Sequence, residues 1–294
     1  VYAMTSHLEE QYQTSWQERQ TFAENMQPIT GQLFRNKGIE ISIYGRPLVN
    51  ASAIDIIKAH RSVALHEENK LRLRESFPFL QALAKMELAP ARIDVGKLAY
   101  RYLFKGEANG LSIEQFLEKE LATIVAKGND VQETKDVVLY GFGRIGRLLA
   151  RLLIERAGPN AKLNLRAIVI RPGKEDDLEK RASLLRRDSV HGAFNGSITI
   201  DKENNVIKAN GAFIKIIYAK SPSEIDYTAY GINDALVVDN TGIWSDEEGL
   251  GQHLQSKGVA KVLLTAPAKG DIKNIVFGVN DDMILADDKI ISAA

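Results

Sequence analysis

Apolar residues in the first 130 positions recur at the spacing of an α-helix. The clearest stripe falls on one helical face between positions 113 and 124. Its members are Ile113, Phe116, Leu117, Leu121 and Ile124. A Ser-x-x-Gln capping box at residues 112–115 precedes this stripe. Because such a box satisfies unpaired N–H groups of a first helical turn, we predict a helix that begins directly after Ser112.

Other segments of this region predict further helices and one extended stretch. A second capping box, at residues 52–55, predicts a helix that runs to about Ser76, where Phe77-Pro78 interrupts it. A shorter helical stripe consists of Val95, Leu98 and Tyr102. Residues 38–49 alternate in polarity and fit a short strand or an extended connector. Residues 1–130 are therefore expected to form a mostly helical domain.

From position 136 onward, short β-branched runs are separated by helical segments. The runs expected to be strands are residues 137–140, 163–170, 236–239, 262–265 and 275–279. Helices are expected at residues 144–156 and 246–255, and an inserted antiparallel ribbon at 198–200, 206–208 and 213–218. This alternation predicts an α/β domain with a parallel sheet. The polar, glycine-containing segment 127–130 is the expected linker, which divides the chain into domains 1–130 and 131–294.

The composition narrows the classes of function. The chain has 294 residues, zero formal net charge and no cysteine. Neutral charge gives no indication of a nucleic-acid partner, and no apolar run reaches the roughly 18 residues of a membrane span. The first residues lack the pattern of a signal peptide, so we expect a cytoplasmic protein. Without cysteine there is no thiol nucleophile, and His7, His60, His66 and His253 share no ligand-like spacing, so no metal site is expected.

A glycine-rich turn follows the first apolar strand of the second domain and opens a helix. Its residues are Gly141, Phe142, Gly143, Arg144, Ile145 and Gly146. The first glycine permits a tight turn, the second permits close approach of the backbone to a pyrophosphate, and the third permits close packing of helix on strand. The start of the helix then offers unpaired N–H donors to the anion. This placement favours a dinucleotide site of the Rossmann type over a plain structural turn.

The residue that would contact the adenosine ribose leaves the choice of cofactor open. In NAD-binding domains an acidic residue about 20 positions after the turn binds the ribose 2′-hydroxyl. Here the second strand ends in Ile170-Arg171-Pro172, and no acid appears before Glu175. Arg171 is placed to meet the 2′-phosphate of NADP. Alternatively, Arg171 is a solvated loop residue and backbone groups hold the ribose of NAD.

Six short motifs resemble the glyceraldehyde-3-phosphate dehydrogenase family and occur in its order. Gly-Phe-Gly-Arg-Ile-Gly-Arg at 141–147 resembles the family's opening motif, and Arg-Asp-Ser-Val-His-Gly at 187–192 resembles its Tyr-Asp-Ser-Thr-His-Gly. Asn-Thr-Gly at 240–242 and Thr-Ala-Pro at 265–267 resemble its Ser-Thr-Gly and Ser-Ala-Pro. Phe-Gly-Val-Asn at 277–280 resembles its Gly-Val-Asn, and Ile-Ile-Ser-Ala-Ala at 290–294 resembles the strand that leads into Ser-Cys-Thr-Thr-Asn.

The resemblance implies a glycolytic dehydrogenase that forms tetramers, in which each subunit joins a Rossmann domain to a catalytic domain. In that family a cysteine attacks a phosphorylated aldehyde, a histidine assists as base, and a hydride passes to NAD or NADP. Phosphate then releases the acyl product. The implied partners of this chain are the nicotinamide dinucleotide, the aldehyde in the full-length form, and further copies of itself.

The resemblance also assigns cofactor contacts by position. Arg144 and Ile145 would contact the pyrophosphate, Lys220 would lie near the adenine, Thr241 and Gly242 on the adenosine side, and Thr265 and Ala266 nearer the nicotinamide. Without the resemblance, Lys220 is a solvated charge and the threonine-containing segments are ordinary turns at strand ends.

This sequence departs from the family pattern in three respects. The family's Asn-Asp-Pro after the second strand is replaced by a segment that ends in Arg171-Pro172. The first 130 residues have no counterpart in the family core and resemble the helical extensions of long bacterial members. The family's catalytic cysteine, its catalytic histidine and its catalytic domain do not occur in this chain. We therefore expect a fragment that has no dehydrogenase activity alone. We also expect that its apolar strands at 275–279 and 290–291 face an uncovered surface. The alternatives are a non-catalytic module that binds NAD(P) and docks a partner, and a dehydrogenase of a related sugar phosphate such as erythrose 4-phosphate.

Overall fold

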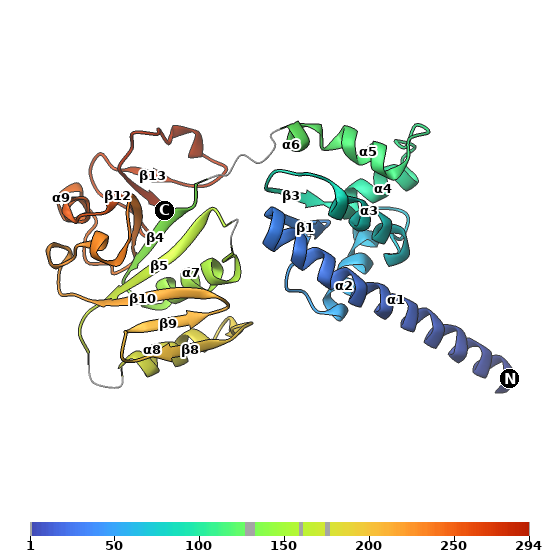
Figure 1. The fold of residues 1–294 in the computed structure, drawn as a ribbon, viewed down its shortest axis with the longest axis horizontal. Helices are drawn as coiled ribbons and strands as arrows, with labels where there is room; N and C mark the ends of the chain where they lie inside the picture. Colours follow the sequence, from blue (N-terminus) through green and yellow to red (C-terminus); the bar gives the residue numbers. More distant parts are fainter. Residues whose placement is uncertain (1, 127–132, 159–160, 174–176, 294) are drawn as a thin grey trace. The chain divides into compact units, whose positions relative to one another are not determined.

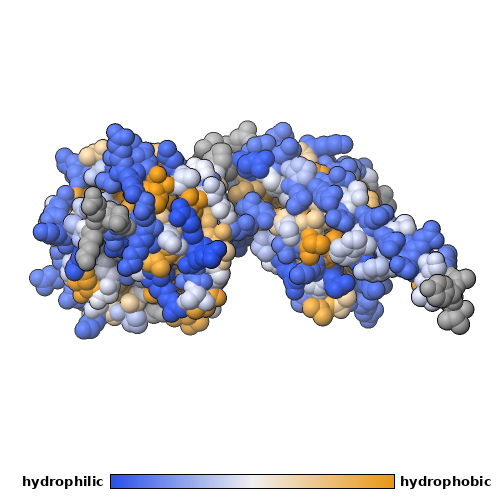
Figure 2. All heavy atoms as spheres, turned by 90° about the horizontal axis from the view of Figure 1, so that it is seen from below, coloured by the Kyte–Doolittle hydropathy of each residue, from blue (hydrophilic) through white to orange (hydrophobic). Residues whose placement is uncertain are grey.

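The computed structural model describes residues 2–126, 133–158, 161–173 and 177–293 (Figure 1). The chain forms two compact units, Val1–Gln132 and Glu133–Ala294. The expected linker at residues 127–130 lies outside the described residues. Within the described part, no helix is both long and apolar enough to cross a membrane. On the face seen in Figure 2, each unit is largely hydrophilic and shows smaller groups of apolar side chains.

The N-terminal unit is mostly helical and includes a small sheet. Its helices are α1 (Tyr2–Lys37), α2 (Ala53–Arg61), η1 (Ser62–Leu65), α3 (Leu73–Lys85), α4 (Val95–Phe104), α5 (Ile113–Glu120) and α6 (Ala122–Ala126). The sheet has the order β2-β1-β3, with β1 (Ile39–Ile43) antiparallel to β2 (Arg46–Pro47) and parallel to β3 (Ala91–Asp94). The start of α5 is as predicted, because the Gln115 N–H donates to Ser112 Oγ at 3.2 Å and the Ser112 N–H donates to Gln115 Oε1 at 3.0 Å.

The prediction of one helix from residue 52 to about Ser76 was wrong. Helix α2 ends at Arg61, and α3 begins at Leu73 and continues through Pro78. Proline in a helix loses one backbone hydrogen bond and costs about 3 kcal/mol. Phe79, Leu80 and Leu83 are fully buried just beyond it, and each contributes roughly 1.5–3 kcal/mol. Burial of this apolar face therefore outweighs the proline.

The second unit contains a nine-stranded sheet in the order β13-β14-β12-β11-β4-β5-β10-β9-β8 (Figure 1). Its principal strands are β4 (Lys135–Tyr140), β5 (Leu163–Ile170), β10 (Ala212–Tyr218), β11 (Ala235–Asp239), β12 (Val259–Leu264) and β14 (Ile290–Ala293). These six pair in parallel with their neighbours in the order β10-β5-β4-β11-β12-β14, which is the Rossmann order 3-2-1-4-5-6. The inserted ribbon, β8 (Ile198–Asp201) and β9 (Val206–Ala209), continues the sheet in antiparallel pairing beside β10.

Alternate residues of the strands enter separate cores on the two faces of the sheet. Val137 and Leu139 pack with residues of α7 (Arg144–Glu155) and α8 (Asp177–Arg186). Val138 and Tyr140 pack instead with Tyr227, which belongs to η3 (Tyr227–Tyr230). The predicted α/β architecture is therefore confirmed, with helical segments on both faces of a mostly parallel sheet.

Three details of this unit differ from expectation. Strand β13 is only Lys273–Ile275, because Gly278 adopts a left-handed φ of 79° and the Val276 N–H donates to Asn280 Oδ1 at 2.7 Å, which closes a turn. The expected helix at residues 246–255 is split into α9 (Glu247–Gly251) and η4 (Gln252–Gln255). Helix α8 was not predicted. The remaining short elements are β6 (Arg187–Asp188), β7 (Gly192–Ala193), η2 (Pro222–Glu224) and η5 (Asp281–Met283).

Candidate functional site

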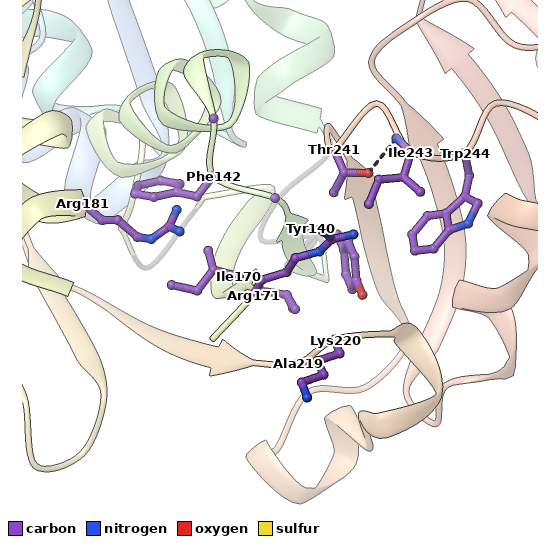
Figure 3. Close-up of a pocket in the computed structure, with 13 residues that line it drawn as sticks. Tyr140, Phe142, Ile170, Arg171, Arg181, Ala219, Lys220, Thr241, Ile243 and Trp244 are labelled. Atoms are coloured by element: carbon purple, nitrogen blue, oxygen red, sulfur yellow. Dashed lines mark hydrogen bonds between the residues drawn. The ribbon is translucent and has the colours of Figure 1, made fainter. Parts of the chain in front are cut away.

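A cavity of about 350 Å³ opens at the carboxyl ends of four neighbouring strands, β10, β5, β4 and β11 (Figure 3). In open parallel sheets, ligands bind at this edge, where the strand order reverses direction. The reversal here falls between β4 and β11, because the chain first adds β5 and β10 on one side of β4 and then β11 and β12 on the other. The cavity therefore lies where the topology places a ligand.

The glycine-rich turn forms one wall of this cavity. Gly141 has a φ of 102°, and a Cβ there would lie 2.9 Å from Thr241 Cγ2. A Cβ on Gly146 would lie 2.5 Å from Asn240 Oδ1 and 2.7 Å from the Gly141 carbonyl oxygen. Both glycines are required by the conformation of the turn and by the close packing of α7 on the β4–β11 edge.

Gly143 differs from these two glycines, because a Cβ built on it would have no heavy atom within 4 Å. It is the N-cap residue of α7 and supplies no side-chain hydrogen bond to the first turn. The early N–H groups of a helix need acceptors, and the helix dipole places partial positive charge at this end. Open space above uncapped donors is the arrangement that an anionic group would fill.

Among the described residues, three cationic side chains line the cavity and no carboxylate does. Arg171 follows β5 and Lys220 follows β10, while Arg181 extends from α8 toward Phe142 (Figure 3). Arg181 Nε also donates to Asp177 Oδ2 at 2.5 Å, which anchors the guanidinium. The cavity therefore carries an excess of positive charge beside its glycine turn.

The opposite wall is a turn held by a buried Asp–His pair. Asp239, at the end of β11, is fully buried, and its Oδ1 accepts hydrogen bonds from Thr241 N at 3.0 Å and Thr241 Oγ1 at 2.8 Å. His253 Nε2 lies 2.7 Å from Asp239 Oδ2. Thr241 Oγ1 in turn accepts from the Ile243 N–H at 3.2 Å (Figure 3). Asp239 thus fixes Thr241 and Ile243 at the edge of the cavity.

Two aromatic rings complete the lining. Tyr140 and Trp244 lie with their ring centroids 6.1 Å apart, and Tyr140 packs edge-on against His253 at 4.6 Å. Burial, followed by the nearby Asp239 carboxylate, raises the pKa of Tyr140 to about 12, so its phenol is neutral at pH 7. These rings provide apolar surface beside the three cations, which suits a ligand with both planar rings and phosphate groups.

Half of the site residues that were predicted from the sequence line the cavity. Those that line it are Gly141, Phe142, Gly143, Arg171, Lys220 and Thr241. Those outside this lining are Arg144, Ile145 and Gly146 in the first turn of α7, Gly242 in the Thr241 turn, and Thr265 and Ala266 beyond β12. Thr265 remains adjacent, because its N–H and Oγ1 both donate to the Asp239 carbonyl oxygen at 3.2 Å.

Sequence reasoning missed Tyr140, Trp244 and Arg181. Tyr140 directly precedes the glycine turn and Trp244 lies two residues after Gly242, so their closeness to these motifs in the sequence could have indicated them. Nothing in the sequence pattern indicated Arg181, because helix α8 itself was not predicted.

Comparison with known proteins agrees with this geometry. Residues 135–247 match the family described as glyceraldehyde 3-phosphate dehydrogenase, NAD binding domain. A "glyceraldehyde-3-phosphate dehydrogenase-like protein" of Pseudomonas aeruginosa is 57% identical over 272 residues, which is 92% of this chain and 59% of that protein. The glyceraldehyde-3-phosphate dehydrogenases of Zymomonas mobilis and Thermotoga maritima are 38% and 36% identical, each over 54% of this chain and 44% of theirs.

The matches cover only part of each relative, and one of them extends beyond the second unit. They cover 59% of the length of the Pseudomonas protein and 44% of each of the other two. The Pseudomonas match of 272 residues is longer than the whole second unit, Glu133–Ala294, so its similarity continues into the N-terminal unit. The second unit is therefore a Rossmann-type NAD binding domain of the glyceraldehyde-3-phosphate dehydrogenase family.

Proposed function

We propose that the cavity beside the glycine turn binds NAD or NADP. The observation that carries this proposal is the uncapped start of α7 with open space above Gly143, at the edge of the sheet where the strand order reverses. The residues present fit a dinucleotide, because the cavity combines N–H donors, three cations and aromatic surface. When bound, the nicotinamide accepts or returns a hydride.

Separate sets of residues in this chain would bind the pyrophosphate, the adenosine half and the nicotinamide half of the cofactor. The N–H groups at Arg144 and Ile145 would hold the pyrophosphate. Arg171, Lys220, Thr241 and Gly242 would contact the adenosine half. Thr265 and Ala266 lie one strand further along the sheet and would contact the nicotinamide half.

We further propose that NADP is accepted at least as readily as NAD. Within residues 133–158, 161–173 and 177–293, no carboxylate lines the cavity to accept a hydrogen bond from a ribose 2′-hydroxyl or to repel a 2′-phosphate. Arg171 and Arg181 both line it and would attract a 2′-phosphate. Calorimetric titration of the chain with each cofactor tests this directly. A strong preference for NAD in the unmodified chain would contradict it.

For the whole protein we propose a dehydrogenase that oxidises a phosphorylated aldehyde such as glyceraldehyde 3-phosphate. We propose further that this protein is cytoplasmic, takes part in glycolysis and forms homo-oligomers. In this proposal the present chain binds and orients the cofactor, and a cysteine elsewhere in the protein attacks the aldehyde. The names of the relatives and the match of residues 135–247 support it. The 294-residue chain has no cysteine and should therefore show no turnover with glyceraldehyde 3-phosphate, phosphate and either cofactor. Turnover by this chain would contradict the thiol mechanism.

A further inference from the structure

A second, larger cavity lies within the N-terminal unit, at a distance in sequence from every residue of the Rossmann unit. It measures about 610 Å³ and is formed by α1, the end of α2 and the start of α3. Small-molecule sites in proteins occupy roughly 300–1,000 Å³, so this volume suits a metabolite rather than a single small ion.

The charged side chains that line this cavity are mostly positive. Of the described residues that line it, the cations are Arg19, Arg61, Lys70, Arg72 and Arg74, and Glu18 is the only carboxylate. Glu18 lies 3.7 Å from Arg74, and both side chains are about half-exposed, so the pair is weak. Arg19 packs over the Trp16 ring at 5.2 Å, which orients it without neutralising it. The remaining cations have no carboxylate of the described residues within ion-pair distance.

The amino end of α3 adds further donors to the same cavity. This helix has 13 residues and begins at Leu73, and the side chain of its N-cap residue, Arg72, makes no cap hydrogen bond. Glu75 Oε1 accepts from the Arg72 N–H at 3.0 Å, so one donor is satisfied. The N–H groups of Leu73 and Arg74 find no acceptor among the described residues. Uncapped donors beside several cations favour an oxyanion.

The floor of the cavity is apolar and uncharged. Phe22, Ile57, Leu71 and Leu73 form most of it. His60 is buried there, with Nδ1 2.8 Å from the Ile56 carbonyl oxygen and Nε2 2.7 Å from Ser76 Oγ. Because both ring nitrogens already have partners, His60 is a structural part of the floor. A ligand that fills this cavity would place an apolar ring or chain on the floor and negative groups at the rim.

We propose that the N-terminal unit binds a small organic polyphosphate, a compound with an apolar or planar body and at least two phosphate groups, independently of the cofactor cavity. The cations come from α1, from the end of α2 and from the segment that leads into the first turn of α3, and all five line one cavity. A charged face that only contacts solvent would not require this convergence. Nothing in the proposed dehydrogenase reaction uses this site.

The experiment compares two charge-matched double variants. Arg61→Gln with Arg72→Gln removes two cations of the cavity, whereas Arg46→Gln with Lys85→Gln removes two exposed cations of the same unit that do not line it. Titration calorimetry at about 0.15 M salt would use ATP and pyrophosphate as probes, with sulfate as the control for a simple divalent anion. Circular dichroism and thermal unfolding show whether the mostly helical N-terminal unit of each variant is folded, and titration with NADH shows that the cofactor cavity of the second unit is unchanged.

The expected result is saturable binding of ATP, weaker binding of pyrophosphate, and a loss of at least tenfold in ATP affinity for the cavity variant alone. Equal affinities in the two variants would mean that any binding is diffuse electrostatic attraction or occurs in the cofactor cavity, and would overturn the proposal. So would the lack of saturable ATP binding at millimolar concentration, or binding of sulfate as tight as that of ATP. None of these outcomes bears on NADH binding, so the proposed function is tested separately.

Discussion

Replacement of Gly143 by valine should separate cofactor binding from folding. Gly143 has φ −79° and ψ −158°, a conformation open to any residue, and a Cβ there meets no heavy atom within 4 Å. The free energy of unfolding should therefore change by no more than about 0.5 kcal/mol. The side chain would, however, occupy the space through which a pyrophosphate approaches the N–H groups of α7.

The expected loss of affinity follows from the hydrogen bonds that valine would prevent. Each hydrogen bond to a charged group contributes about 1.5–3 kcal/mol, so two lost bonds reduce affinity by about 3–6 kcal/mol. At about 1.4 kcal/mol per tenfold change, this is roughly a hundredfold to ten-thousandfold.

The assay is calorimetric titration with NADH together with thermal unfolding. Gly158→Val is the matched control, because a Cβ at Gly158 also meets no heavy atom within 4 Å and Gly158 does not line the cavity. It should retain both affinity and stability. Affinity like that of the unmodified chain in Gly143→Val would refute the role assigned to this glycine.

Three further substitutions or conditions test other parts of the account. Gly146→Ala should destabilise the Rossmann unit by about 1–3 kcal/mol, because its Cβ would lie 2.7 Å from the Gly141 carbonyl oxygen; an unchanged melting temperature would show that the helix can move away. Arg171→Asp should lower the ratio of NADP to NAD affinity at least tenfold by removing a cation and adding a repelling charge, and an unchanged ratio would remove Arg171 from the site. Burial lowers the pKa of His60 from its ordinary 6.5 to about 4, so the folded unit resists protonation that the unfolded chain accepts. The contribution of neutral His60 to the free energy of unfolding should be fully present above pH 6.5 and fall by up to about 3 kcal/mol as the pH approaches 4. In urea titrations at each pH, His60→Gln should show a weaker dependence of this free energy on pH.

The local features of the candidate site could be predicted from the sequence because they depend on neighbouring residues. The conformations of Gly141 and the open position of Gly143 follow from one turn between a strand and a helix, and Arg171 follows directly from the end of β5. The ribbon beside β10 was predicted for the same reason, since its strands are joined by a short polar turn.

Features that depend on tertiary packing could not be predicted in this way. The Asp239–His253 pair joins residues 14 positions apart through the burial of η4 against the sheet. The N-terminal cavity gathers cations that lie between positions 19 and 74, with no spacing that would mark them as one site. The path of α3 through Pro78 depends on burial of Phe79 and Leu80, which outweighs a local signal that usually ends a helix.

Fluorescence energy transfer can show whether the cavity at the ends of β4, β5, β10 and β11 binds a nicotinamide dinucleotide. The chain has two tryptophans, and Trp244 lines the cavity whereas Trp16 belongs to α1. In a Trp16→Phe variant, Trp244 is the only tryptophan donor, and bound NADH or NADPH is the acceptor. We expect saturable quenching of tryptophan emission with matching sensitised emission from one reduced cofactor per chain. Both signals should be lost when Trp16→Phe is combined with Gly143→Val. Titration of the Trp16→Phe variant to millimolar NADH and NADPH without saturable transfer would contradict the proposed binding.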